Sequence, residues 1–247
     1  MKKIVLLLFL FLIVVGCKND TQLTFEPSVF SNDTCKDCPK VAINIPKALD
    51  NSKIAESINS SLREELISLL TFDEETEVAT IDEALTSFNN GYLEIKKKFN
   101  DESENWEADI NGIITFENKN LLALQLDTYM FTGGAHGYSS VTYLNFDKKK
   151  GIELENWELF KDNTHFIKFA ETKFRIQEGI PQGSPINSTG FMFENEVFHL
   201  PINIGFNKEG LVLHYNQYEV ASFADGPIIV ILPFDEIKNY LSFKIKP

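Results

Sequence analysis

The sequence predicts an α+β fold in which antiparallel sheets, built as meanders, pack against helices in two subregions of similar size. Apolar residues recur at three- and four-residue spacing over 54–69 and 81–99, which is typical of helices with one buried face. Shorter apolar runs separated by turn residues precede and follow them. The links between the later runs are too short for crossover helices, which favours antiparallel meanders over βαβ units.

The first half is predicted to hold two strands, the two helices and a meander. Asp50 or Asn51 is expected to cap the first helix, and Thr80 with Glu83 forms a capping box at the second. In order, the expected strands are 23–30, 41–45 (ended by Pro46), 106–110 and 112–117 with an Asn-Gly turn between them, 121–131, and 138–146.

The second half is predicted to hold helices and a second meander. Trp157, in a predicted helix start, is expected to pack against the core. The expected elements are helices at 155–160 and 164–177, a flexible loop at 179–190, strands at 191–201, 202–207, 211–221 and 227–233, and a short closing helix at 233–241.

The amino terminus predicts export. Lys2 and Lys3 precede an apolar run, 4–15, that is short for a bilayer span and fits a signal peptide over residues 1–16. The letters VVGC match a lipobox, so Cys17 is the predicted lipidation site, for example for palmitate. A generic signal peptide with a chance cysteine is the alternative. Lipid on Cys17 would anchor the protein to a membrane without spanning it.

The charge balance excludes one class of partner. The 247-residue chain has a formal net charge of −13, and loss of residues 1–16 with their two lysines would make it −15. Nucleic acid is not expected as a partner, because binding its backbone requires Lys and Arg. The acidic surface suits solubility or the attraction of a basic partner.

Cys35 and Cys38 form a C-x-x-C pair. Thioredoxin-type chemistry places such a pair between a strand and a helix, whereas an extended run, 41–46, follows here. Zinc would require two further ligands, and neither a second C-x-x-C nor an H-x-x-x-H is present. An exported protein meets an oxidising compartment, so a small structural disulfide is favoured over redox function. Neither a metal nor a cofactor is expected.

Two stretches carry a resemblance to a known family. Residues 132–160 hold a Gly-Gly-Ala-His-Gly turn, a Tyr-x-Asn-Phe-Asp strand and a Leu-Phe helix start. Residues 198–241 hold a Gly-Leu strand, Tyr-Glu-Val-Ala, a Gly-Pro and a strand ending in Pro-Phe. Both resemble the extracytoplasmic domain of the RsiV-like family of lysozyme-sensing anti-sigma factors. The region 40–130 is similar, more weakly, to the domain that precedes the catalytic domain of PdaC-type peptidoglycan deacetylases.

This resemblance implies an envelope binding or sensor module. Residues 17–24 are expected to be a tether, residues 25–131 a PdaC-associated α+β domain, and residues 132–247 an RsiV-like α+β domain of unknown function. The sigma-binding segment and transmembrane helix of RsiV-type proteins are not expected here, and neither is a deacetylase domain. Neither sigma-factor control nor deacetylation is therefore carried over.

The glycine-rich turn is the candidate site. His136 is a weak candidate for a general base, with Asp127, Ser139 and Ser140 near it in sequence. No G-x-S-x-G elbow or H-E-x-x-H pair accompanies it, and a tight hairpin is a sufficient reason for the glycines. His165, His199 and His214 lack ligand spacing and are expected to be packed or on the surface. The candidate binding residues are Gly133, Gly134, His136, Gly137 and Tyr138.

The sequence thus predicts a non-catalytic, lipid-anchored binding or sensor protein of the bacterial cell envelope, outside the cytoplasm. Its place would be the periplasmic face of the outer membrane or the cell surface. A basic protein such as a lysozyme-like muramidase, or peptidoglycan, is the expected partner. The alternative is a hydrolase or deacetylase that acts on the cell wall through His136.

Overall fold

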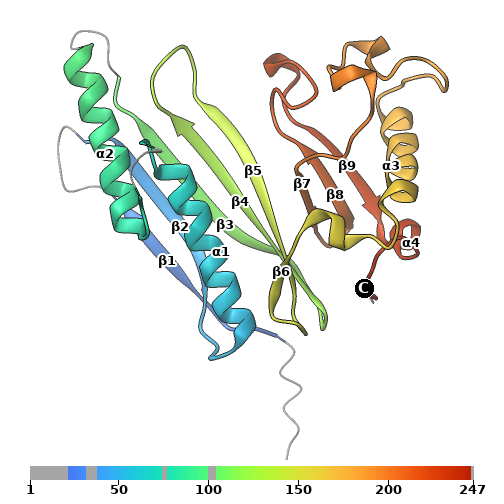
Figure 1. The fold of residues 1–247 in the computed structure, drawn as a ribbon, viewed down its shortest axis with the longest axis horizontal. Helices are drawn as coiled ribbons and strands as arrows, with labels where there is room; N and C mark the ends of the chain where they lie inside the picture. Colours follow the sequence, from blue (N-terminus) through green and yellow to red (C-terminus); the bar gives the residue numbers. More distant parts are fainter. Residues whose placement is uncertain (1–21, 32–37, 74–76, 100–103, 246–247) are drawn as a thin grey trace, which may run out of the picture.

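The computed structural model describes residues 22–31, 38–73, 77–99 and 104–245. In this part of the chain a six-stranded sheet has the order β1-β2-β3-β4-β5-β6, and a three-stranded sheet has the order β7-β8-β9. The predicted α+β class is confirmed (Figure 1). The strands are β1 (Phe25–Ser31), β2 (Lys40–Ala48), β3 (Glu107–Glu117), β4 (Leu121–Phe131), β5 (Tyr138–Asp147), β6 (Ile152–Leu154), β7 (Asn203–Phe206), β8 (Gly210–Tyr215) and β9 (Ile228–Pro233).

The described helices follow the predicted pattern, with shifted ends. Ser52 caps α1 by accepting a hydrogen bond from the Ala55 N–H, so the caps expected at Asp50 and Asn51 were wrong. The capping box of Thr80 and Glu83 at α2 is confirmed. The helices are α1 (Lys53–Leu70), α2 (Ile81–Lys98), α3 (Asn163–Gln177) and α4 (Phe234–Ile237), with 3-10 turns η1 (Asn156–Leu159), η2 (Ile186–Thr189), η3 (Glu194–Glu196) and η4 (Phe223–Asp225).

The two faces of the large sheet cover different cores. Helices α1 and α2 lie on one face, where Leu122, Leu124 and Leu126 of β4 are buried against them (Figure 1). Leu121 and Ala123 point to the opposite face and pack with the three-stranded sheet and α3. Side chains along β4 alternate between the two faces of the sheet, so this one strand contributes to both cores.

The topology departs from the predicted meanders in three places. β2 pairs with β3 in parallel, across the connection that holds α1 and α2, and every other named strand pair is antiparallel. The turn expected at Asn111 and Gly112 was wrong, because β3 runs through both residues. The strand expected over 191–201 was also wrong, since this segment holds the turn η3. The sequence predicted a domain boundary after residue 131. β5 and β6 come after this boundary in the chain, yet they belong to the same six-stranded sheet as β1 to β4.

The described cores begin close to Leu23. The buried residues of the two cores and the hydrophobic residues packed against them lie between Leu23 and Ile245. A fragment over residues 20–247 therefore retains every described element and both cores, without the predicted signal and lipidation site. Among the described residues, no helix combines the length and apolarity needed to cross a bilayer.

Candidate functional site

A cavity of about 300 Å³ lies between the open face of the large sheet and the loops that follow β8. The side chains of β3, β4 and β5 that reach it lie on the face opposite α1 and α2, in register with one another. Most of the residues that form it have polar side chains, among them two carboxylates and no Lys or Arg, but the surface that they turn toward the cavity is mainly apolar. The lining residues are Asp109, Asn111, Asp127, Thr128, Tyr129, Ser139, Ser140, Val141, His214, Asn216, Gln217 and Pro227.

Asp127 is the electrostatic centre of this cavity. Its carboxylate accepts a hydrogen bond of 2.7 Å from the Gln125 side chain. Burial, and then the charge of Asp127, raise the pKa of the Tyr143 hydroxyl to about 12. Burial lowers the pKa of the His214 imidazole, and Asp127 opposes that shift. The ring centroids of the half-buried Tyr143 and the buried His214 lie 6.4 Å apart, so one carboxylate acts on two rings from two different sheets.

The buried His214 gives a pH prediction. Its pKa is lowered in the folded state, so below the ordinary value of about 6.5 the unfolded chain binds more protons than the folded one. His214 therefore contributes its full stability above its ordinary pKa. This contribution is lost as the pH falls toward the lower pKa that His214 has in the folded protein. We expect His214→Gln to lose less stability than the wild type on acidification, measured by urea unfolding at about pH 7.5 and about pH 5.

The exposed His165 provides the control for this measurement. His165→Gln removes an imidazole on the surface of α3, so it reports the effect of losing a histidine without burial. A pH dependence of His214→Gln equal to that of the wild type would contradict the assignment.

Two side-chain contacts hold the cavity walls together. The Asn216 amide accepts from the Val141 N–H (2.9 Å) and donates to the Val141 carbonyl (3.0 Å), as a neighbouring strand would. Asn145, which is buried, donates to the Ile204 carbonyl of β7 at 2.7 Å. These contacts fix the three-stranded sheet against β5 and so set the width of the cavity.

The predicted glycine-rich turn connects β4 to β5 at the rim of the cavity. Gly133 and Gly134 have φ of +100° and +93°, a conformation that favours glycine. A Cβ on Gly137 would lie 2.5 Å from the Tyr129 ring, so this glycine permits close packing. The exposed His136 ring stacks on Phe223 of η4, with centroids 4.1 Å apart.

The structure separates His136 from its proposed partners. Asp127, Ser139 and Ser140 line the cavity, whereas the Nδ1 of His136 lies 3.0 Å from the Gly137 carbonyl and its ring faces Phe223. Tyr138 connects the two regions, because its hydroxyl donates to the Gln217 carbonyl at 3.2 Å. His214 and Asp109 enter the cavity from positions that sequence patterns did not single out.

One exposed tyrosine lines the cavity, and two others are sequence neighbours of lining residues. Tyr129, Tyr138 and Tyr218 expose 38%, 38% and 57% of their surface. Tyr218 has a φ of +67°, an uncommon conformation for tyrosine, and its ring lies 5.4 Å from that of Phe223. Exposed tyrosines beside a hollow are typical of protein-binding surfaces, where aromatic residues are enriched.

Some predicted residues lie outside the described part of the chain. These are the signal over 1–16, the lipidation site Cys17 and one member of the expected disulfide, Cys35. Cys38 lies just before β2. Lipidation and the Cys35–Cys38 disulfide therefore stay predictions. No group of three or more His, Cys, Asp or Glu suited to a metal was found among the residues that the structure describes.

The fold and the cavity define a two-part α+β protein with an open cavity between its large sheet and its smaller sheet. Comparison with known families agrees with this division. Residues 33–139 match the family model described as Deacetylase PdaC, and residues 158–235 match the model described as a protein of unknown function, DUF3298. The RsiV-like resemblance stays a prediction. No curated protein matches the chain.

Solved structures share the whole fold. A DUF3298-family member from Bacteroides fragilis has a TM-score of 0.68 and 19% identity, over 90% of this chain and 94% of that one. A DUF3298-family protein from Pseudomonas aeruginosa has a TM-score of 0.66 and 17% identity, over 90% of this chain and 95% of that one. At these identities the likeness shows a common fold.

Proposed function

We propose that this chain is a non-catalytic, lipid-anchored binding protein of the bacterial cell envelope. The cavity and its aromatic rim would receive a basic protein such as a lysozyme-like muramidase, or cell-wall material. The two family matches support an envelope-related role. The lipobox at Cys17 supports the anchor.

The main support for the proposal is the negative charge of the residues that line the cavity. Asp109 and Asp127 bring two carboxylates to a lining in which no described residue is Lys or Arg. Such a site favours cationic groups and hydrogen-bond donors and repels anions. Lysine and arginine side chains on a basic partner would supply the complementary charge, and the rim tyrosines would supply apolar contact area.

The glycine-rich turn would belong to the same surface. His136 and Phe223 stack beside Tyr218, and Tyr138 continues directly into the cavity-lining Ser139. This arrangement supports a contact role for the turn and assigns no proton transfer to His136.

Calorimetric titration of the 20–247 fragment tests the proposal. Hen lysozyme, a panel of other muramidases and soluble peptidoglycan fragments would serve as ligands. We expect saturable binding of at least one, and a drop in affinity of about tenfold or more for Asp109→Asn with Asp127→Asn, because desolvated charge pairs at interfaces are worth at least that much.

The matched control replaces two exposed carboxylates away from the cavity, Asp82→Asn with Asp235→Asn. It changes the net charge equally and should leave affinity nearly unchanged at moderate salt. An equal loss of affinity in both variants would contradict the cavity as the contact site. Absence of binding to every ligand would contradict the proposed function.

A further inference from the structure

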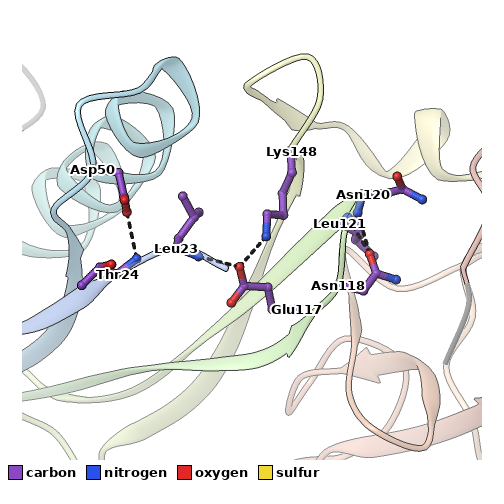
Figure 2. Close-up of polar contacts among 8 residues, drawn as sticks. All are labelled: Leu23, Thr24, Asp50, Glu117, Asn118, Asn120, Leu121 and Lys148. Atoms are coloured by element: carbon purple, nitrogen blue, oxygen red, sulfur yellow. Dashed lines mark hydrogen bonds and ion pairs between the residues drawn. The ribbon is translucent and has the colours of Figure 1, made fainter. Parts of the chain in front are cut away.

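Lysines gather at the end of the molecule where the described chain begins. The Leu23 N–H donates to Glu117 at the tip of the β3–β4 hairpin (3.0 Å), and the Lys148 ammonium pairs with the same carboxylate (Figure 2). The Thr24 N–H donates to Asp50 at 2.8 Å. The start of the chain is therefore fixed against the hairpin tips at this end of the sheet.

Hydrogen bonds place further lysines at the same end of the molecule. Lys53 donates to the Lys150 carbonyl at 3.0 Å, and the Asn120 side chain donates to the Lys244 carbonyl at 2.8 Å. Lys119, Lys149 and Lys244 line a hollow of about 500 Å³. We name this surface the basic end; it comprises Lys53, Lys119, Lys148, Lys149, Lys150 and Lys244.

The nearby carboxylates leave a surplus of positive charge. Asp50 and Glu117 accept the hydrogen bonds already described, and Asp147 accepts from the Lys149 and Lys150 N–H groups. Lys148 and Glu117 are buried as a pair, so the other five lysines face Asp50, Asp147 and Glu56 of the first turn of α1, in a chain whose formal net charge is −13. The basic end has the opposite sign to the protein as a whole.

The remaining acidic charge would not mask this surface. Over the eleven residues of β3, the distance from Glu117 to Glu107 is about 33 Å at the rise of an extended strand. At physiological ionic strength charges are screened beyond about 8 Å. A planar anionic surface at the basic end would therefore respond to its lysines and much less to distant carboxylates.

We propose that the basic end is the membrane-facing surface of the protein and binds anionic lipid head groups. Clusters of lysines next to a membrane attachment point are favoured by the negative surface potential of anionic lipids. Cys17 is six residues before Leu23, so a lipid on Cys17 would keep the basic end within about 20 Å of the bilayer. The surface itself does not depend on that lipid.

Vesicle sedimentation of the 20–247 fragment tests this surface without the anchor. Phosphatidylcholine vesicles with and without phosphatidylglycerol would be compared at low salt. We expect binding only to the anionic vesicles and release at about 1 M salt, where screening is nearly complete. Lys119→Glu, Lys149→Glu and Lys150→Glu together should lower the partition coefficient by at least roughly 100-fold, since each lysine near such a surface contributes about fivefold and each glutamate adds repulsion.

The control reverses three exposed lysines elsewhere, Lys97→Glu, Lys98→Glu and Lys168→Glu. It has the same net charge as the test variant and should keep most of the binding. An equal loss in the two variants, or equal binding of the wild type to neutral vesicles, would overturn the proposal. Thermal unfolding and muramidase binding of both variants check that the fold and the cavity are intact, so this outcome is separate from that of the proposed function.

Discussion

Lys148→Met should lower the free energy of unfolding by about 3–5 kcal/mol, because it leaves a buried carboxylate without its cation. The side chains of Lys148 and Glu117 are only 7% and 12% exposed. Methionine keeps the apolar stem of the lysine, so the loss would report the charge. Glu117 would retain the Leu23 N–H as a donor, which is weaker compensation (Figure 2). Urea unfolding at neutral pH measures the change.

Two further variants identify the cause of that loss. Lys150→Met removes a lysine that is 63% exposed and 3.8 Å from Asp147, so it should cost less than about 1 kcal/mol. Glu117→Gln combined with Lys148→Met should recover much of the lost stability, since neither charge is then buried alone. A loss below about 1 kcal/mol for Lys148→Met alone would show that water reaches Glu117.

Gly205→Ala is expected to lower the free energy of unfolding by about 1–3 kcal/mol through overpacking between the two sheets. A Cβ on Gly205 of β7 would lie 2.0 Å from Cδ1 of the Tyr143 ring on β5. The ring is held by its buried surroundings, so β7 would have to move away from the large sheet. Thermal unfolding gives the stability. Titration with a muramidase that binds the wild type shows whether the cavity has changed.

The Tyr143→Ala background provides the control. Without the ring, the same glycine substitution should cost little, and the double-mutant cycle should show an interaction energy of about 1 kcal/mol or more. Equal effects of Gly205→Ala in the two backgrounds would mean that the Tyr143 contact does not limit this position.

The helices could be predicted closely because each carries its own signal. The expected ranges 54–69 and 81–99 compare with Lys53–Leu70 and Ile81–Lys98. In both, one apolar face repeats over several turns and is buried against the same sheet. Strand pairing was harder to predict from the sequence. Paired residues of β2 and β3 are separated by more than sixty intervening residues, and no local pattern indicates that the two strands are parallel.

Local signals failed where tertiary contacts overrode them. Gly112 indicates a turn in sequence, but in the structure a Cβ there would lie 2.9 Å from Cδ of Pro46, so the glycine allows β2 and β3 to approach. Trp157 was expected to pack and is 66% exposed, because η1 turns it outward. Its neighbour Leu159 is buried instead.

The candidate site was only partly visible in the sequence. Asp127, Ser139 and Ser140 were noted for their closeness to His136, and all three line the cavity. Asp109 and His214 join them from β3 and β8, strands of separate sheets that are brought together only by packing. Residues assembled in this way have no fixed spacing, so a motif could not have indicated them.

The pairing of Asn216 with Val141 has a consequence for aggregation. Along most of β5 the outer edge has no strand paired with it by backbone hydrogen bonds among the described residues, since β6 pairs only with Asn145, Phe146 and Asp147. An open strand edge is a template for another chain and hence for aggregation. One side-chain amide occupies both the donor and the acceptor at the middle of this edge. The folded chain is thereby protected from adding a foreign strand at this edge, beside the cavity.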